Sequence, residues 1–140
     1  MSLRPFHLAL PVKSLENARQ FYTGILNCPE GRSDTTWVDF NFFGHQLVFH
    51  LDPSHQSTSI TNPVDNHAVP VPHMGILLKK DDWLTITTTI SNHQLPFIIE
   101  PYIRFKGQPG EQGTCFLYDF NHIALEFKYF ESDDKIFETN

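Results

Sequence analysis

The sequence contains only two cysteines, Cys28 and Cys115, and they are not arranged as a CxxC pair. This spacing indicates neither a secreted disulfide scaffold nor a zinc ribbon. The ten lysine and arginine residues form no cluster, and the formal net charge is −6. A chain without a basic patch lacks the electrostatic footprint that nucleic acid or anionic lipid requires, so we expect neither as a partner.

Long hydrophobic runs are also absent. The longest ones, such as HLALPV and MGILL, are far shorter than the roughly 20 apolar residues of a membrane-spanning helix. No charged and then apolar leader precedes the first predicted strand. We therefore expect a cytoplasmic, reduced protein whose 140 residues form a single globular domain.

Aromatic and alternating segments are plentiful, with 13 phenylalanines. Residues 3–12 are predicted to form a strand, and the segment from Leu15 has a helical stripe for about three turns with Ser14 as its N-cap. TWVDFNF alternates in hydrophobicity, Phe43 and Gly44 form a turn, and HQLVFHL follows as another strand. The first half thus has the order strand, helix, strand, strand.

The second half repeats this plan. VPHMGILLKK resembles the opening strand, DDWLTITTTISNHQ takes the helical position with Asp81 or Asp82 as N-cap, and three strand-like segments follow. The sequence predicts an α+β fold with module 1 at about 3–52, a loop or linker at about 53–70, module 2 at about 71–130 and a polar tail at 131–140.

Superposing the two halves brings four potential metal ligands to equivalent positions. The strand starts place His7 opposite His73, and the last strands, GHQLVFHL and FNHIALEF, match His50 with Glu126. Each of these histidines, taken alone, also fits a hydrogen-bonded or half-exposed strand residue. Glu126 lies within the apolar run IALEF, where a carboxylate is costly to bury unless it is paired or bound to a cation. The set as a whole therefore favours a metal site.

Three imidazoles and one carboxylate, without a thiolate, suit one divalent ion of the first transition row. Fe²⁺ is our first choice, because two histidines and a carboxylate form the facial arrangement of non-haem iron oxygenases, and Mn²⁺, Ni²⁺ and Zn²⁺ are the alternatives. A catalytic ion would keep at least one coordination position open for substrate.

These segments resemble the vicinal oxygen chelate superfamily, which includes glyoxalase I, extradiol dioxygenases, fosfomycin-resistance enzymes and bleomycin-binding proteins. The resemblance rests on FHLALPV, NARQFY, GHQLVFHL, VPHMGILL and HIALEFK and covers nearly the whole chain. It implies two βαβββ modules, related by a pseudo-twofold, whose sheets form a cupped, partly closed cavity around a metal ion. It also implies a homodimer, a small-molecule substrate and the metal ligands His7, His50, His73 and Glu126.

The resemblance implies a metal-dependent enzyme that acts on vicinal oxygens of a small substrate, and we expect dioxygenase-like chemistry. A lyase or isomerase of the lactoylglutathione lyase type is the alternative. That type generally uses two glutamates at the metal, whereas this chain has His50 in place of the first. A non-catalytic small-molecule binder of the bleomycin-resistance type is a further alternative.

A second group of polar residues surrounds the Pro-Gly turn in EPYIRFKGQPGEQG. Arg104, Lys106 and Gln108 are candidates for binding a substrate carboxylate or phosphate. Glu111 is a candidate general acid or base, and Arg104 a candidate catalytic partner. The alternative is a solvated hairpin whose charges keep an edge strand unpaired.

Overall fold

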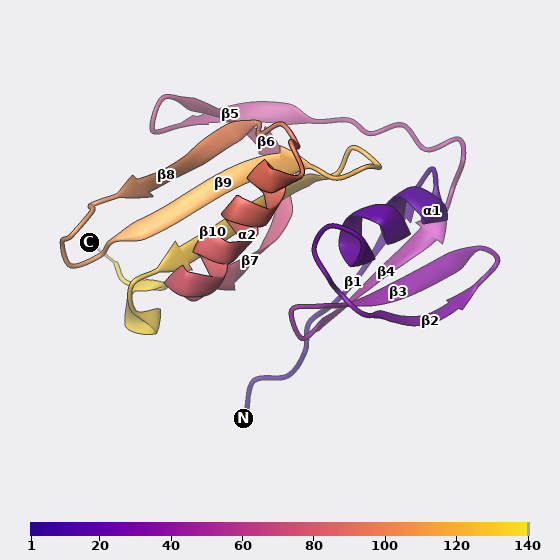
Figure 1. Cartoon of the computed structure of the whole chain (residues 1–140), viewed down its shortest axis with the longest axis horizontal. Coiled ribbons are helices and arrows are strands. Elements are labelled where there is room, and N and C mark those ends of the chain that lie inside the picture. Colours follow the sequence, from indigo (N-terminus) through magenta and orange to yellow (C-terminus); the bar gives the residue numbers. More distant parts are fainter. Residues whose placement is uncertain (140) are drawn as a thin grey trace. The chain divides into compact units, whose positions relative to one another are not determined.

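The computed structural model describes residues 1–139, which divide into two compact units. Unit 1 contains Met1–Thr58 and the tetrapeptide Asp119–His122, and unit 2 contains Ser59–Tyr118 and the described residues from Ile123 on. Each unit has one four-stranded mixed sheet with a helical segment packed against it (Figure 1). The two predicted βαβββ modules are therefore confirmed.

In unit 1 the sheet has the order β1-β4-β3-β2, built from β1 (His7–Val12), β4 (His45–Leu51), β3 (Trp37–Phe42) and β2 (Glu30–Asp34). β1 and β4 are parallel, and the other pairs are antiparallel. The helical segment is α1 (Leu15–Ala18), continued by the wider turns of η1 (Arg19–Thr23). The predicted N-cap is confirmed, because the Ser14 hydroxyl accepts a hydrogen bond from the Asn17 N–H at 3.1 Å.

An aromatic cluster forms the core between this helical segment and the sheet. The Tyr22 ring lies 5.0–5.9 Å from the rings of Phe40, Phe42 and Phe49. These side chains are buried, as the alternation of TWVDFNF and HQLVFHL predicts. The residues between them on the same strands, including Gln46 and His50, therefore point to the opposite, open face of the sheet.

In unit 2 the sheet has the order β7-β10-β9-β8, built from β7 (Met74–Leu78), β10 (Ala124–Phe130), β9 (Gln112–Tyr118) and β8 (Ile99–Arg104). α2 (Lys80–Asn92) packs on β9 and β10 with Trp83, Ile86 and Ile90 buried. The predicted N-cap of this helix is wrong. The helix begins at Lys80, so Asp81 and Asp82 lie in its first turn, where carboxylates interact favourably with the helix dipole, and Lys79 is an N-cap without a side-chain hydrogen bond.

The segment predicted as a loop or linker at 53–70 contains a β-hairpin, β5 (Ile60–Val64) and β6 (His67–Val71). Asp65 and Asn66 both have positive φ angles, 49° and 65°, which is the conformation of a two-residue hairpin turn. Asn and Asp accept this conformation more readily than other non-glycine residues. The Ser, Thr, Asn and Pro content that suggested a loop is thus compatible with two short strands.

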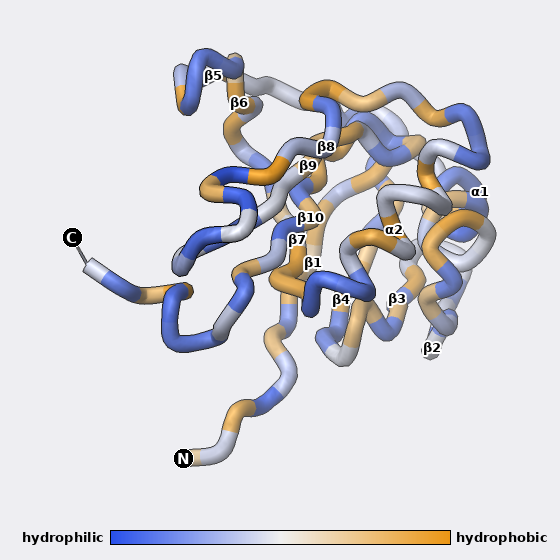
Figure 2. The backbone as a smooth tube through the Cα atoms, turned by 60° about the vertical axis from the view of Figure 1, so that its left-hand side comes forward, coloured by the Kyte–Doolittle hydropathy of each residue, from blue (hydrophilic) through white to orange (hydrophobic). Residues whose placement is uncertain are grey.

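After β10 the chain forms one turn of 3₁₀ helix, η2 (Asp133–Lys135), and is mainly hydrophilic (Figure 2). The predicted polar tail extends to residue 140, which lies outside the described residues. No helix in residues 1–139 is both long enough and apolar enough to cross a membrane.

Candidate functional site in unit 2

His73 and Glu126 come together on the face of the unit 2 sheet that α2 does not cover. Glu126 pairs with Gly75 on the parallel neighbour β7, and His73 immediately precedes this strand. The His73 Nε2 atom lies 3.2 Å from Glu126 Oε2. The side chains are 28% and 18% exposed, so solvent and small molecules reach both.

Two further groups fix the orientation of this pair. His73 Nδ1 lies 2.7 Å from the Pro70 carbonyl oxygen, and Thr114 Oγ1 donates to Glu126 Oε1 at 2.7 Å. Because a carbonyl oxygen only accepts, His73 Nδ1 carries a proton, and in the neutral ring Nε2 presents a lone pair to the carboxylate. Two acceptors at 3.2 Å require a cation between them or a proton on Nε2. The residues therefore fit a divalent metal ion.

One side of the pair is apolar. The His73 ring is in edge contact with Phe116, with centroids 5.1 Å apart. Phe116 packs with Val69 of the β5–β6 hairpin and Ile99 of β8 in a buried cluster. Packed apolar side chains thus cover one side of the ligand pair and support the His73 ring.

The structure does not bring His7 and His50 together within unit 1. His7 pairs with Gln46 and His50 pairs with Pro11, so their positions differ by four residues, about 13 Å along the strands. In unit 2 the corresponding offset between His73 and Glu126 is two residues, because Glu126 pairs with Gly75. When His7 is matched with His73, the strand register therefore does not also match His50 with Glu126.

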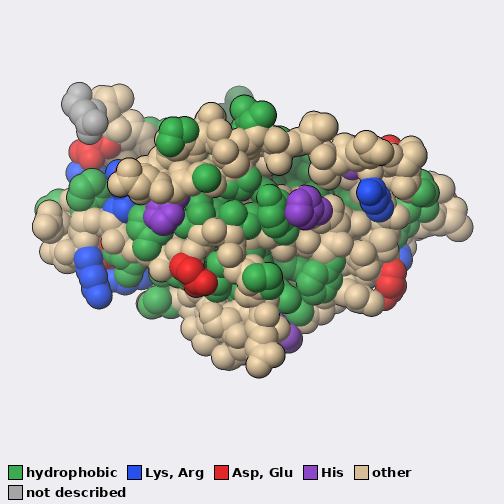
Figure 3. Space-filling view, turned by 90° about the horizontal axis from the view of Figure 1, so that it is seen from above, with side chains coloured by type: hydrophobic (Ala, Val, Ile, Leu, Met, Phe, Trp, Pro, Cys, Tyr) green, Lys and Arg blue, Asp and Glu red, His purple; other side chains and the backbone are tan. Residues whose placement is uncertain are grey.

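Both unit 1 histidines lie on the open face of their sheet and are exposed. His7 Nδ1 is 2.8 Å from Gln46 Oε1, which fixes this ring. His50 has Trp37 and Pro11 as its strand neighbours. Figure 3 shows histidine side chains at the surface among hydrophobic ones. In neither unit do three or more His, Cys, Asp or Glu side chains within residues 1–139 form a ready-made metal cluster.

Glu111 lies on the other side of the unit 2 sheet from Glu126. It accepts hydrogen bonds from Lys80 Nζ at 2.7 Å, the Tyr129 hydroxyl at 2.9 Å and the Gly107 N–H at 2.9 Å. Chiefly because of Lys80, and then Gly107 and Tyr129, the pKa of Glu111 falls to about 2. A carboxylate with these partners holds the 105–111 turn against α2 and is separated from His73 and Glu126.

Arg104 also has partners in the fold. Its Nε atom lies 2.9 Å from Asp65 Oδ2 in the hairpin turn, and its guanidinium lies 5.2 Å from the Phe105 ring centroid. Counting along the strand pairs, Arg104 is four residues along and two strands across from Glu126, about 13 Å by about 10 Å. Lys106 and Gln108 are exposed in the turn beyond it. The predicted substrate-binding group is thus distant from the His73–Glu126 pair within unit 2.

The sequence did not reveal the groups that orient the ligand pair. Thr114 and the Pro70 carbonyl have no sequence signature of their own, because each depends on strand register. Gly75 carries a clearer signal: a side chain there would overlap the Glu126 backbone oxygen, so this strand position requires glycine.

The chain matches no protein-family model and no curated protein sequence. It is similar to the crystal structure of a glyoxalase/bleomycin resistance protein/dioxygenase from Alicyclobacillus acidocaldarius. The two share 30% identity, with 95% of this chain and 96% of the other covered and a TM-score of 0.76. The chain belongs to the glyoxalase/bleomycin resistance protein/dioxygenase superfamily. The resemblance predicted from the sequence is confirmed.

Structures with lower sequence identity share the fold. A fosfomycin resistance protein from Listeria monocytogenes matches with 19% identity and a TM-score of 0.66, covering 96% of this chain and 98% of the other. A lactoylglutathione lyase from Agrobacterium tumefaciens matches with 14% identity and a TM-score of 0.65, covering 99% and 98%. Proteins with different named activities thus share this fold, and the reaction has to be argued from the site.

Proposed function

We propose that this protein is a divalent-metal-dependent enzyme of the superfamily that acts on vicinal oxygens of a small substrate in a dioxygenase-like reaction. The observation that carries this proposal is the His73–Glu126 pair, in which His73 Nε2 lies 3.2 Å from a carboxylate oxygen while Nδ1 faces the Pro70 carbonyl. His73 and Glu126 would hold a divalent metal ion through this nitrogen and this oxygen.

The donor atoms favour an ion of the first transition row. One imidazole nitrogen and one carboxylate oxygen, without a thiolate, suit Fe²⁺, and Mn²⁺, Ni²⁺ or Zn²⁺ are the alternatives. When bound, such an ion acts as a Lewis acid toward two adjacent substrate oxygens, and iron in addition activates O₂. His7 and His50 stay in the proposal as the predicted further ligands, each to be tested by its own variant.

The residues around the pair have defined tasks. The Pro70 carbonyl keeps the His73 ring in the tautomer whose Nε2 is a metal donor, and Thr114 holds one Glu126 oxygen so that the other points toward His73. Phe116, which is buried with Val69 and Ile99, contacts the edge of the His73 ring and holds that ring in place.

Metal analysis tests the proposal. The protein is loaded anaerobically with Fe²⁺, Mn²⁺, Ni²⁺ or Zn²⁺, and bound metal is measured by plasma mass spectrometry in wild type, His73→Ala and Glu126→Gln. His93→Ala is the matched control, because His93 is exposed at the end of α2. We expect about one equivalent in wild type and the control and a loss in both site variants. No bound metal in wild type under any loading would reject the enzyme proposal and favour a metal-free binder.

The reaction is tested on the loaded protein. Oxygen uptake with a panel of catechols is the expected outcome for the iron form. Turnover of the adduct of methylglyoxal and glutathione without oxygen uptake would instead assign the protein to the lyase and isomerase branch. His7→Ala and His50→Ala, tested in both assays, show whether each unit 1 histidine contributes to metal retention.

A further inference from the structure

Asp39 of β3 is a buried carboxylate on the face of the unit 1 sheet that the helix does not cover. It is 7% exposed, accepts a hydrogen bond from the Arg32 N–H, and accepts another from Gln46 Nε2 at 3.2 Å. Its oxygen lies directly over Gly31 of β2, where any side chain would overlap it. The strand sequence thus leaves space specifically for this carboxylate.

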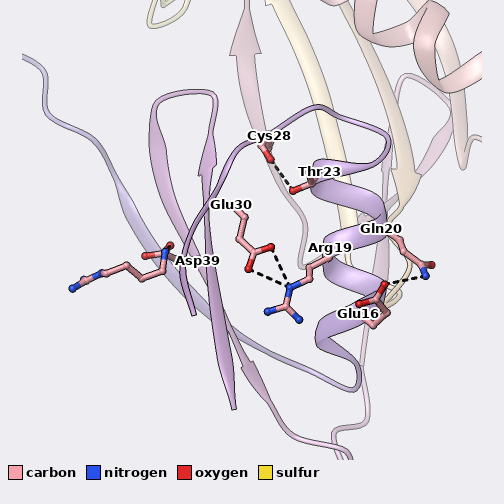
Figure 4. A network of polar contacts seen from close by, with 8 residues as sticks. Glu16, Arg19, Gln20, Thr23, Cys28, Glu30 and Asp39 are labelled. Carbon is pink, nitrogen blue, oxygen red and sulfur yellow. Dashed lines mark hydrogen bonds and ion pairs between the residues drawn. The ribbon is translucent and has the colours of Figure 1, made fainter. Parts of the chain in front are cut away.

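No lysine or arginine in the described part of the chain forms an ion pair with Asp39. Arg19, on the helix side of the sheet, donates instead to both oxygens of Glu30 at 3.1–3.2 Å (Figure 4). Burying a carboxylate without a cation is costly, and a single backbone N–H compensates only part of that cost. Asp39 therefore depends on its second hydrogen-bond donor, Gln46 Nε2.

The donor and acceptor roles of these contacts connect Asp39 to His7. A carboxylate only accepts, so it fixes the Gln46 amide with Nε2 toward Asp39 and Oε1 toward His7. Oε1 is itself an acceptor, and it lies 2.8 Å from His7 Nδ1, so Nδ1 carries the proton. His7 Nε2 is then left with a lone pair on an exposed ring.

In unit 2 a different group fixes the same tautomer of the corresponding histidine. There the Pro70 carbonyl accepts a hydrogen bond from His73 Nδ1, which leaves the lone pair of the neutral ring on Nε2. Two histidines at the starts of corresponding strands are thus held in one tautomer, one by a backbone oxygen and the other by a chain of two side chains.

We propose that Asp39 is a positioning residue: through Gln46 it fixes His7 in the Nδ1–H tautomer, so that Nε2 is available as a metal ligand. The metal role rests on the proposed function, whereas the tautomer is a property of unit 1 alone. Neither Asp39 nor Gln46 touches the metal in this proposal.

The substitution Asp39→Asn has a specific consequence. The amide that replaces the carboxylate keeps its oxygen for the Arg32 N–H, so its nitrogen becomes a donor toward Gln46. The Gln46 amide then turns over, with Oε1 toward position 39 and Nε2 toward His7. Gln46 Nε2 donates to His7 Nδ1, and the imidazole proton moves to Nε2. A nearly isosteric change thereby inverts the tautomer of a ring two hydrogen bonds away.

Long-range ¹⁵N–¹H NMR of the imidazole rings measures this directly in the metal-free full-length protein at a pH where His7 is neutral, with the His7 signals assigned from His7→Phe. We expect the Nδ1–H pattern in wild type and the Nε2–H pattern in Asp39→Asn. Asp34→Asn is the matched control, because Asp34 is an exposed aspartate of β2 that bonds only to its neighbour Thr35, and it should keep the wild-type pattern. An unchanged His7 tautomer in Asp39→Asn would overturn the proposal.

Two further measurements complete the test. Gln46→Met removes the hydrogen bonds that link Asp39 to His7, and the exclusive Nδ1–H pattern should be lost. Because Gln46 is exposed, this variant tests the proposal even if Asp39→Asn does not fold. Zn²⁺ titration should show affinity reduced about 10–100-fold in Asp39→Asn, the usual effect of removing a partner of a metal-bound histidine. If wild type binds neither Zn²⁺ nor any of the other three metals, the proposed function fails, while the NMR result still decides the role of Asp39.

Discussion

Glu111 has three hydrogen-bond partners inside the protein, Lys80, Gly107 and Tyr129. These hydrogen bonds lower its pKa from an ordinary 4.5 to about 2 in the folded state. The folded protein therefore binds this proton less readily than the unfolded chain. The stability that Glu111 contributes is fully present above about pH 4.5 and is lost as the pH falls toward 2.

We predict that Glu111→Gln removes part of the acid sensitivity of the protein. Urea unfolding, followed by circular dichroism, should show a lower midpoint for the variant at pH 7 and a smaller difference from wild type at pH 3. The control is Glu100→Gln, which alters an exposed carboxylate of β8. A variant whose midpoint equals that of wild type at pH 7 would show that the Lys80 and Tyr129 contacts contribute nothing to stability.

At the scale of elements, β7 and β10 approach each other closely at Gly75. We predict that Gly75→Ala destabilises the protein by about 1–3 kcal/mol or more, because the added methyl group overlaps the Glu126 backbone oxygen. The strand pair that carries His73 and Glu126 should separate locally. Hydrogen exchange of the β7 and β10 amides is expected to accelerate, with the unit 1 sheet unchanged; uniform exchange across both sheets would contradict this local explanation.

The two helix starts provide a matched pair of predictions. Ser14 caps α1 with its hydroxyl, so Ser14→Ala should lower the free energy of unfolding by about 1 kcal/mol. Lys79 has an extended backbone at the start of α2 but no capping bond, so Lys79→Ser should raise that free energy by about 0.5–1 kcal/mol. Chemical denaturation measures both, and a loss of stability in Lys79→Ser would contradict the prediction.

The same elements show what sequence could predict. Hydrophobic alternation identified the inner strands of both sheets, because one face of each of these strands is buried. It missed β2, whose residues are all exposed, and the Thr- and Ile-rich helix 80–92 was predicted from the repeat. Strand register is different, since sliding β4 past β1 by two residues leaves the same side chains on the same face. The predicted match of His50 with Glu126 depended on register, which hydrophobicity did not specify.

At the scale of the whole molecule, each unit contains one buried cysteine. Burial raises the pKa of Cys28 from 9.0 to about 11 and that of Cys115 to about 12. Both thiols are buried and rarely ionised, so we predict that a disulfide reagent labels each at least about 100-fold more slowly in the native protein than in the unfolded chain. Rapid native labelling of either cysteine, located by mass spectrometry, would show that its unit opens readily.

The superfamily resemblance also leads us to propose a homodimer. Light scattering coupled to size-exclusion chromatography should then give twice the 16.2 kDa of one chain. The monomer mass at all concentrations would reject this assembly and leave the proposed metal chemistry to a single chain.

The tetrapeptide Asp119–His122 follows β9 and precedes β10, yet it belongs to unit 1. Its Asp119 accepts from the buried Tyr22 hydroxyl at 2.8 Å, and its Asn121 bonds both the backbone N–H and the carbonyl of Ser14. A gene truncated after residue 58 would thus encode a first half without the loop that completes it. If the two repeats arose by duplication of an ancestor that folded alone, unit 1 has since come to include a loop from the second half of the chain. Dividing the chain at a single point therefore cannot produce two complete units.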